Sequence, residues 1–148
     1  MPFDCTPLLD LPLPQREDVV VKIDSTTTLR VRPIPPWHVS RRVDGNESAL
    51  AVLVRARQLL ADERCWCQGA FARTWLNLPV PSRFALARRY CALGAIMRAG
   101  RELGLPTIDA QKALEWQTVI SVADWNDDRL RTHGDVLAAF DATIVALA

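Results

Sequence analysis

A cysteine, a histidine and an aspartate are this chain's best candidates for chemistry: Cys91, His133 and Asp127. A thiol beside an imidazole is the minimum for a cysteine nucleophile, and a neighbouring carboxylate can orient the ring. We expect His133 in the first turn of a helix, where the helix dipole favours the neutral ring that a general base requires. The set predicts a thiol hydrolase or an acyl transferase. The alternative is a small buried Cys91 and a His133 that hydrogen-bonds the preceding loop.

The cysteines also suggest a zinc site. Zinc accepts three thiolates and one imidazole, and the chain could supply them from Cys65, Cys67, Cys91 and His133. However, the Cys-x-Cys spacing of residues 65–67 is less diagnostic than a pair of Cys-x-x-Cys elements. We therefore predict neither a bound metal nor a cofactor.

Three residues in expected loops are candidates for ligand binding: Gln68, Trp125 and Asn126. Loops can present polar groups to a ligand while helices hold them in place. The alternative is that the two amides satisfy loop backbone groups and that the tryptophan wedges between helices. The chain has no glycine-rich phosphate loop, no Gly-x-Ser-x-Gly and no His-Glu-x-x-His. It therefore lacks the signatures of nucleotide-binding proteins, serine hydrolases and zincins.

The longest helical pattern, from Ser82 to Gly104, is expected to be the element on which the others pack. Four large residues in it recur at the spacing of one helical face: Leu86, Tyr90, Leu93 and Met97. A mid-helix glycine costs roughly 1 kcal/mol relative to alanine, so Gly94 predicts another backbone close to this helix. Cys91 would lie in the third turn, away from the N-terminal position that stabilises a thiolate.

Three further helices are expected, over residues 46–62, 107–123 and 132–148, with a loop at 63–81 and a turn at 125–128. Asn46 or Ser48 can cap the first of them, and Thr107 the second. The third has the clearest start, because Thr132 and Asp135 form a capping-box pattern. Apolar residues at helical spacing are expected to be buried: Leu50, Leu53, Val54, Leu60, Ile108, Leu114, Val119, Val122, Val136, Leu137, Phe140, Ile144 and Leu147.

Residues 1–45 differ in character from the rest of the chain. Prolines break up the first fifteen residues, which are expected to form an irregular arm. Two β-branched runs, 18–23 and 27–32, predict a β-hairpin whose Leu29 and Val31 face the protein. The fold class is therefore mainly α, a small four-helix domain (46–148) with an N-terminal β-hairpin and irregular arm (1–45) as an accessory part.

Charge is unevenly distributed in a chain whose formal net charge is +1. Residues 46–106 carry nine arginines and four acids, a balance of +5, whereas residues 107–148 carry three bases and seven acids, a balance of −4. We expect basic and acidic helices to lie side by side. The alternative is a nucleic-acid site, although the near-neutral whole argues against it. That site would use Arg83, Arg88, Arg89, Arg98 and Arg101.

The composition, 49% hydrophobic and 24% charged, is ordinary for a soluble globular protein. No stretch approaches the roughly 20 apolar residues of a membrane helix. The N-terminus also lacks the charged start and apolar core of a signal peptide. We therefore expect a cytoplasmic protein with reduced thiols and no membrane partner.

Three motifs resemble those of an uncharacterised family of small bacterial and phage-associated proteins. They are Trp66-Cys67-Gln68-Gly69-Ala70, Cys91-Ala92-Leu93-Gly94-Ala95, and Trp125-Asn126-Asp127 followed by Arg131-Thr132-His133. The resemblance covers about residues 48–148 and implies a shared fold. In that family the position of Cys67 is often threonine, and the arm and hairpin lie outside the common region. The resemblance brings no established activity with it.

The sequence as a whole favours a non-enzymatic binding or regulatory module that acts through protein contacts. An exposed hairpin edge also predicts self-association. A cysteine-dependent enzyme that uses Cys91 and His133 is the first alternative, and a nucleic-acid-binding protein that uses the basic central helix is the second. No sequence feature identifies a small-molecule ligand.

Overall fold

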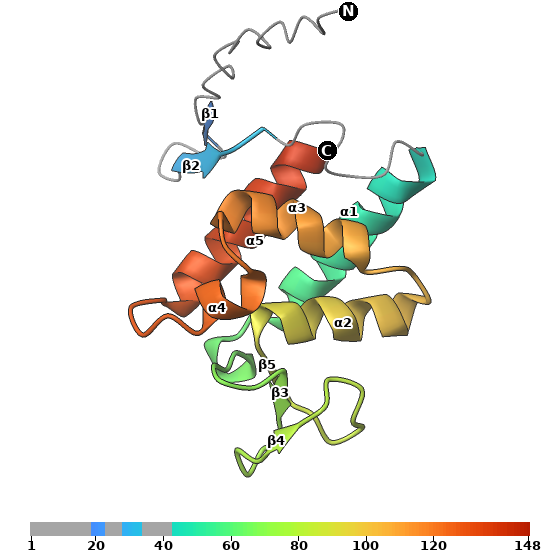
Figure 1. Ribbon diagram of the computed structural model, residues 1–148, viewed down its shortest axis with the longest axis vertical. Coiled ribbons are helices and arrows are strands. Elements are labelled where there is room, and N and C mark those ends of the chain that lie inside the picture. Colours follow the sequence, from blue (N-terminus) through green and yellow to red (C-terminus); the bar gives the residue numbers. More distant parts are fainter. Residues whose placement is uncertain (1–18, 23–27, 34–42) are drawn as a thin grey trace, which may run out of the picture.

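The computed structural model describes residues 19–22, 28–33 and 43–148, and over them it shows the mainly α-helical fold that the sequence predicts. The helices in these residues are α1 (Val43–Leu59), α2 (Ala92–Leu103), α3 (Ile108–Thr118), α4 (Val122–Asn126) and α5 (His133–Leu147). A hairpin lies at one end of the helical body and a small sheet at the other (Figure 1). No helix within the described ranges is long and apolar enough to cross a membrane. The predicted arm at 1–15 lies outside these ranges.

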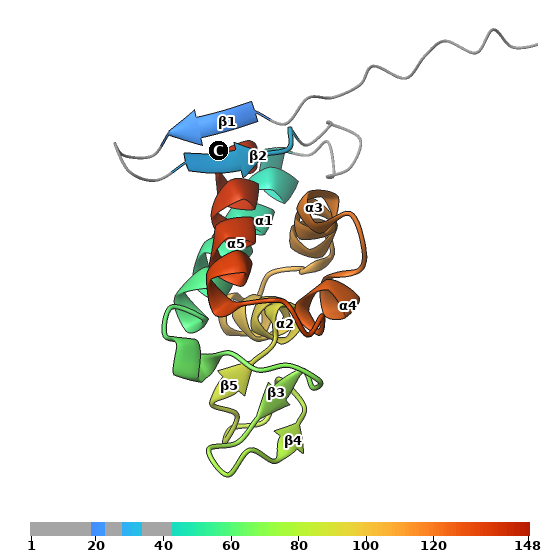
Figure 2. The same ribbon diagram turned by 90° about the vertical axis from the view of Figure 1, so that its left-hand side faces the viewer.

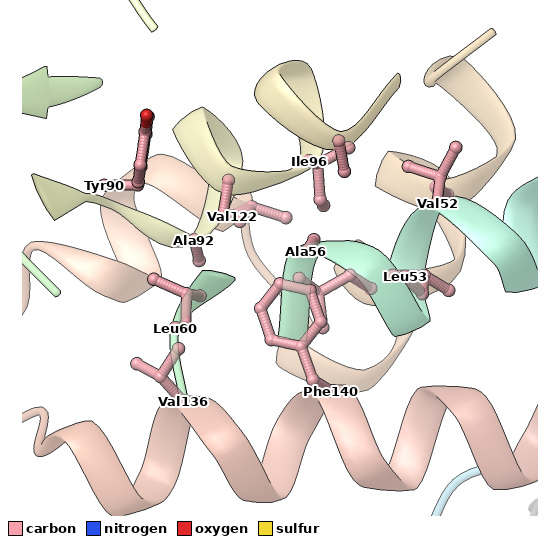
Figure 3. Close-up of a cluster of buried hydrophobic side chains, with 14 of the residues drawn as sticks. Val52, Leu53, Ala56, Leu60, Tyr90, Ala92, Ile96, Val122, Val136 and Phe140 are labelled. Atoms are coloured by element: carbon pink, nitrogen blue, oxygen red, sulfur yellow. The ribbon is translucent and has the colours of Figure 1, made fainter. Parts of the chain in front are cut away.

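The core is built from all five helices. Phe140 of α5 points between Leu53 and Ala56 of α1, and Ile96 of α2 lies close by (Figure 3). Burying one such side chain stabilises the fold by roughly 1.5–3 kcal/mol. The other large side chains with at most 1% exposure include Val52, Leu60, Leu114, Val122 and Val136. Leu53, Leu60, Leu114 and Val122 were predicted to be buried, and these predictions are confirmed. The prediction is wrong for Val54, which is 37% exposed.

Helix α2 is shorter than the sequence predicts. It begins at Ala92, so the predicted helix is wrong over residues 82–91, where Arg89–Tyr90 form a strand instead. The predicted inward stripe is also wrong at Leu86, which is 55% exposed, and at Met97, which is 42% exposed. The buried face of α2 consists mainly of small residues: Ala92, Gly94, Ala95, Ile96, Ala99 and Gly100. Small residues let neighbouring backbones approach closely, and of the large residues of α2, Ile96 is buried while Met97 and Leu103 are exposed.

The prediction for Gly94 is confirmed. A Cβ atom built on this glycine would collide with the carbonyl oxygen of Phe71, and the carbonyl carbon and Cα of Phe71 lie next to it. The backbone of Phe71 therefore crosses α2 in close contact. Only a residue without a side chain fits at this crossing.

Residues 63–81 contain more than the predicted loop. A short 3₁₀ turn at Glu63–Cys65 is followed by strands β3 (Ala72–Arg73) and β4 (Pro79–Val80). With β5 (Arg89–Tyr90) they form an antiparallel sheet of order β4-β3-β5, which projects beyond the helices near the start of α2 (Figure 2). Each strand has two residues, too few to produce a recognisable alternating pattern in the sequence.

The predicted helix at 107–123 is two helices. Helix α3 ends at Thr118, because Val119 adopts a left-handed conformation with φ 71°. The N–H of Val119 donates to the carbonyl of Glu115. Ser121 then starts α4 by accepting a hydrogen bond from the backbone N–H of Asp124. The predicted burial is wrong for Val119, which is 67% exposed, and for Ile108, which is 53% exposed. The predicted turn at 125–128 begins in the last turn of α4.

The predicted hairpin is confirmed. Strands β1 (Val19–Lys22) and β2 (Thr28–Val31) pair antiparallel, with Val19 opposite Val31. Leu29 and Val31 are buried against Ala142 of α5, whereas Arg30 is exposed. After β2, the backbone of Arg32 exchanges two hydrogen bonds with the side chain of Gln117 on α3. The hairpin therefore packs on α5 and is fastened to α3.

Helix α5 begins with the predicted capping box. The Thr132 hydroxyl accepts from the N–H of Asp135 at 3.2 Å, and the Asp135 carboxylate accepts from the N–H of Thr132 at 2.9 Å. Replacing Thr132 with alanine is expected to lower the free energy of unfolding by about 1 kcal/mol, because an N-terminal N–H loses its partner. Urea denaturation measures this loss. Thr107→Ala is the matched control, since Thr107 precedes α3 without a side-chain capping bond and should lose less.

The same capping box makes stability depend on pH. The hydrogen bonds from Thr132 lower the pKa of Asp135 below its usual value. A carboxylate with a lowered folded-state pKa stabilises the protein above its unfolded pKa, about 3.9, and loses this contribution as pH falls through the folded value. The wild-type protein should therefore exceed Asp135→Asn in stability at pH 7, and the difference should shrink below about pH 4. A constant difference across urea titrations at several pH values would contradict this.

Helices of the basic and acidic regions lie side by side, as expected: α1 packs against α3 and α5, and α2 against α3 and α4. Arg57 of α1 pairs with Asp141 of α5, with Nε 2.7 Å from Oδ1. In the described part of the chain, this is the one ion pair between the basic region at 46–106 and the acidic region at 107–148. Three further arginines of the basic region, Arg55, Arg64 and Arg98, pair with Glu102 or Asp62 of the same region.

Candidate functional site

A groove of about 980 Å³ lies between the small sheet and α2. One wall comes from β4 and the residues after it, and the other from the face of α2 that carries Cys91, Met97 and Arg101. The lining is mainly apolar, with few charged groups. The lining residues are Gly69, Ala70, Phe71, Pro79, Val80, Pro81, Ser82, Arg83, Cys91, Met97, Arg101, Ala123 and Asp127. We call this surface the Phe71 groove.

The sequence predicts Cys91 in the third turn of a helix, and this prediction is wrong. Cys91 lies in the Phe71 groove. It is the N-cap residue of α2, and its thiol accepts a hydrogen bond from the N–H of Gly94 at 3.2 Å. Its own N–H donates to the carbonyl of Phe71. Burial raises the pKa of the Cys91 thiol, although the hydrogen bond from Gly94 acts in the opposite direction. The helix N-terminus therefore does not turn Cys91 into a thiolate at neutral pH.

Cys67 lies beside this site in a similar environment. Its N–H donates to the carbonyl of Tyr90 at 3.0 Å, so the chain before Cys91 runs next to it. Burial, and to a lesser extent the neighbouring Cys91, raise the pKa of the Cys67 thiol to about 11. Both thiols are therefore protonated near pH 7 and poorly nucleophilic.

Native labelling with iodoacetamide at pH 7 should discriminate among the described cysteines. Cys65 is partly exposed, whereas Cys67 and Cys91 are 3% and 4% exposed. We expect Cys65 to be modified first and the other two to react only after unfolding in urea. Mass spectrometry of the peptides measures each rate separately. Faster labelling of Cys91 than of Cys65 would contradict the burial argument and favour a reactive thiol.

His133 lies away from the lining of the Phe71 groove. It is the first residue of α5, as predicted, and its Nε2 is 2.6 Å from the carbonyl oxygen of Leu60. Its ring also lies 6.2 Å from the ring of Trp66, centroid to centroid. Among the described residues, no hydrogen bond joins His133 to Cys91 or Asp127. The catalytic assignment of the three residues stays a prediction, and the Leu60 contact joins His133 to the end of α1, not to the loop before α5 that the alternative named.

Asn126 is a fully buried connection point between three segments. Its Oδ1 accepts from the indole Nε1 of Trp66 at 2.9 Å and from the N–H of Ala92 at 3.0 Å. Its Nδ2 donates to the carbonyl of Cys67 at 3.2 Å and to the carboxylate of Asp127 at 2.8 Å. One amide thus links the 66–68 segment, the start of α2 and the end of α4.

Gln68 and Asp127 extend this network. The Gln68 amide donates to the carbonyls of Asn126 and Asp128, at 2.7 and 2.9 Å. Asp127 accepts from the N–H of Gly69 at 2.9 Å, and it also reaches the groove. The structure therefore brings Gln68, Asn126 and Asp127 together with Cys91 nearby, through backbone contacts that the sequence cannot reveal.

Trp125, the third predicted ligand-binding residue, is 8% exposed at the end of α4. The guanidinium of Arg131 lies over its ring at 4.3 Å, and the Arg131 Nε donates to its carbonyl at 3.2 Å. The side-chain amides of Gln68 and Asn126 bond to the chain itself, as in the alternative, and Trp125 is buried. Their assignment as ligand-binding residues stays a prediction.

The zinc set that the sequence suggests is not assembled. Throughout the residues described here, no three His, Cys, Asp or Glu side chains are grouped so that they could hold a metal ion. His133 contacts Leu60 while Cys91 lines the groove, so the set Cys65, Cys67, Cys91 and His133 is divided between two places.

Sequence reasoning missed a set of large, exposed apolar residues, two of which, Phe71 and Met97, line the Phe71 groove. All but Met97 lie in the loop and sheet region at 71–86, where the sequence predicted either loop or a buried helical face. We call the following set, with Met97 of α2, the exposed apolar cluster: Phe71, Trp75, Leu76, Leu78, Phe84, Leu86 and Met97. A run of apolar residues in a segment with weak secondary structure is the signal that could have revealed them.

Comparison with known proteins places the helical part of the chain in a family. Comparisons with curated proteins and with solved structures found no match in either case. A family match covers residues 45–146, from α1 almost to the end of α5, and leaves out the hairpin β1–β2. The chain belongs to the family of unknown function DUF6197.

Proposed function

We propose that this domain is a binding module that acts through protein contacts, with its binding surface at the end formed by the small sheet and the start of α2. The observation that carries the proposal is the exposed apolar cluster. Its members are 42% to 76% exposed. Soluble monomers rarely expose large contiguous apolar patches, and those that exist are often interaction sites.

The turn between β3 and β4 supports the proposal. Trp75 is 76% exposed, and Leu76 and Leu78 are 59% and 58% exposed. The turn is fixed rather than loosely attached, because the N–H groups of Thr74 and Asn77 bond to carbonyls across it. Asn77 has φ 65°, and its side chain accepts from Arg89 at 3.0 Å. A turn fixed in this way holds its apolar side chains in place for a partner, which reduces the entropic cost of binding.

Photo-cross-linking tests this proposal. A benzophenone amino acid would be placed at position 76 in a bacterial host, the setting that the family resemblance implies, with position 130 as the control. Leu130 is 87% exposed and lies outside the cluster. We expect defined cross-linked proteins at position 76 that are absent at position 130. Cross-links to a second copy alone would identify the surface as a self-association interface.

Each cross-linked protein would then be purified, and its dissociation constant measured by calorimetry. The double variant Trp75→Ser and Leu76→Ser is expected to weaken binding at least tenfold, because both side chains lose their apolar contacts. Leu130→Ser should leave binding unchanged. Equal binding by the wild type and the double variant would overturn the proposal. Since all three side chains are exposed, thermal stability should be nearly the same in every variant.

A further inference from the structure

The stretch of chain that forms most of the Phe71 groove carries charges of one sign, and Asp127 is the one acid among the described residues of the lining. Residues 64–101 contain seven arginines and no aspartate or glutamate. Arg64 and Arg98 pair with carboxylates outside this stretch, and Arg73, Arg88 and Arg89 donate to carbonyls or to Asn77. The remaining two, Arg83 and Arg101, are exposed, line the groove, and make no hydrogen bond or ion pair within the described residues.

We infer that the Phe71 groove binds an extended, acidic peptide segment of a protein partner, an inference that rests on the proposed function. An apolar side chain of the segment fills the groove against Phe71, Val80 and Met97. Its carboxylates pair with Arg83 and Arg101. Arginine suits this role, because its planar guanidinium can donate two parallel hydrogen bonds to one carboxylate.

The length of the groove sets the length of the segment. Cys91 and Arg101 lie ten residues apart on one face of α2, which is about 15 Å along the helix axis. An extended chain advances about 3.3 Å per residue, so four to five residues span this distance. The charge is also directional, since Asp127 lies near Cys91 at one end and Arg101 at the other. The acidic residues of the segment are therefore expected at the Arg101 end.

A peptide fits this surface better than other anionic partners do. The groove is concave and mainly apolar, so it needs a side chain to fill it. A nucleic-acid backbone would need a continuous track of cations, whereas the groove offers two arginines and one aspartate. An anionic membrane is flat and would contact the exposed turn at Trp75 without filling the groove.

Peptide selection tests the inference directly. A random-peptide display library would be selected on the whole chain, and the enriched peptides synthesised with a fluorescent label. We expect enrichment of a large apolar residue within four positions of at least one Asp or Glu. Fluorescence anisotropy then gives the dissociation constants. Arg83→Glu and Arg101→Glu should each weaken binding at least tenfold, and a peptide with lysine in place of its acid should recover affinity for the Glu variants.

The control is Lys112→Glu, which makes the same change of charge on α3, outside the groove. It should alter affinity less than twofold. Enriched peptides without acidic residues, or equal binding by Arg83→Glu and wild type, would overturn the inference. So would tighter binding of the Phe71 groove to an oligonucleotide or to phosphatidylserine vesicles than to any peptide. If position 76 still yields a protein partner in these cases, the proposed function survives the failure of this inference.

Discussion

Replacing Gly94 with alanine should destabilise this protein by about 3 kcal/mol, even though alanine is the better helix former. Alanine gains roughly 1 kcal/mol in helix propensity. That gain is outweighed, because the new Cβ collides with the backbone carbonyl of Phe71. A backbone carbonyl cannot rotate away as a flexible side chain can, so the strand must shift and the packing between β3 and α2 must open. Urea unfolding at pH 7, followed by circular dichroism, measures the loss.

Gly134→Ala is the matched control, since it makes the same change in another helix. The nearest atom to its new Cβ is the Thr132 hydroxyl oxygen at 3.7 Å, an ordinary contact. Here the helix propensity of alanine should dominate, and stability should rise by up to about 1 kcal/mol. Opposite signs in the two variants would show that the close crossing determines the result. Equal, small effects would mean that Phe71 yields easily and that the crossing does not fix the groove.

The sequence predicted those features of the fold that depend on local chemistry. The capping box at Thr132 and Asp135 needs only two residues three positions apart. The hairpin needs two β-branched runs and a short link. Gly94 was informative because a glycine in mid-helix is costly unless it has a packing reason. In each case the residue type alone limits the structures that are possible.

The sequence failed where burial depends on partners far along the chain. Leu86 and Met97 have the spacing of an inward stripe, yet both are exposed, while Ala95 and Ala99 are buried. Alanine carries little hydrophobic signal, so a helix face packed closely on small residues is difficult to recognise. The two-residue strands β3, β4 and β5 likewise form only because Arg73 and Ala72 find partners in both neighbouring segments.

In the candidate site, too, the residue types could be predicted from the sequence, whereas their arrangement in space could not. Sequence reasoning selected Cys91, Asp127, Gln68 and Asn126, and the structure brings these four into one neighbourhood. The position of His133 relative to them could not be predicted, because it depends on how α5 crosses the end of α1. The Phe71 groove was invisible for the same reason, since its walls come from segments up to 58 positions apart, from Gly69 to Asp127.

Asn126→Ala is expected to be the most damaging single change in this region, with a loss of about 4 kcal/mol in the free energy of unfolding. The side chain is fully buried and makes four hydrogen bonds. Removing it leaves the N–H of Ala92, the indole N–H of Trp66 and the carbonyl of Cys67 without a partner. Each buried polar group left unsatisfied costs about 1–3 kcal/mol, with partial relief where water enters. Chemical denaturation measures the sum.

Asn126→Asp separates the hydrogen-bond argument from the effect of a cavity, because aspartate has nearly the same shape. One carboxylate oxygen can still accept from Trp66 and Ala92, but the other would face the carbonyl of Cys67 and the carboxylate of Asp127. We expect this variant to lose at least as much stability as Asn126→Ala at pH 7. Asn46→Asp is the control, since Asn46 is exposed in the first turn of α1, where an added negative charge is mildly favourable. If Asn126→Asp were as stable as the wild type, the donated hydrogen bonds would contribute little, and the connection between α4, α2 and the 66–68 segment would depend on packing alone.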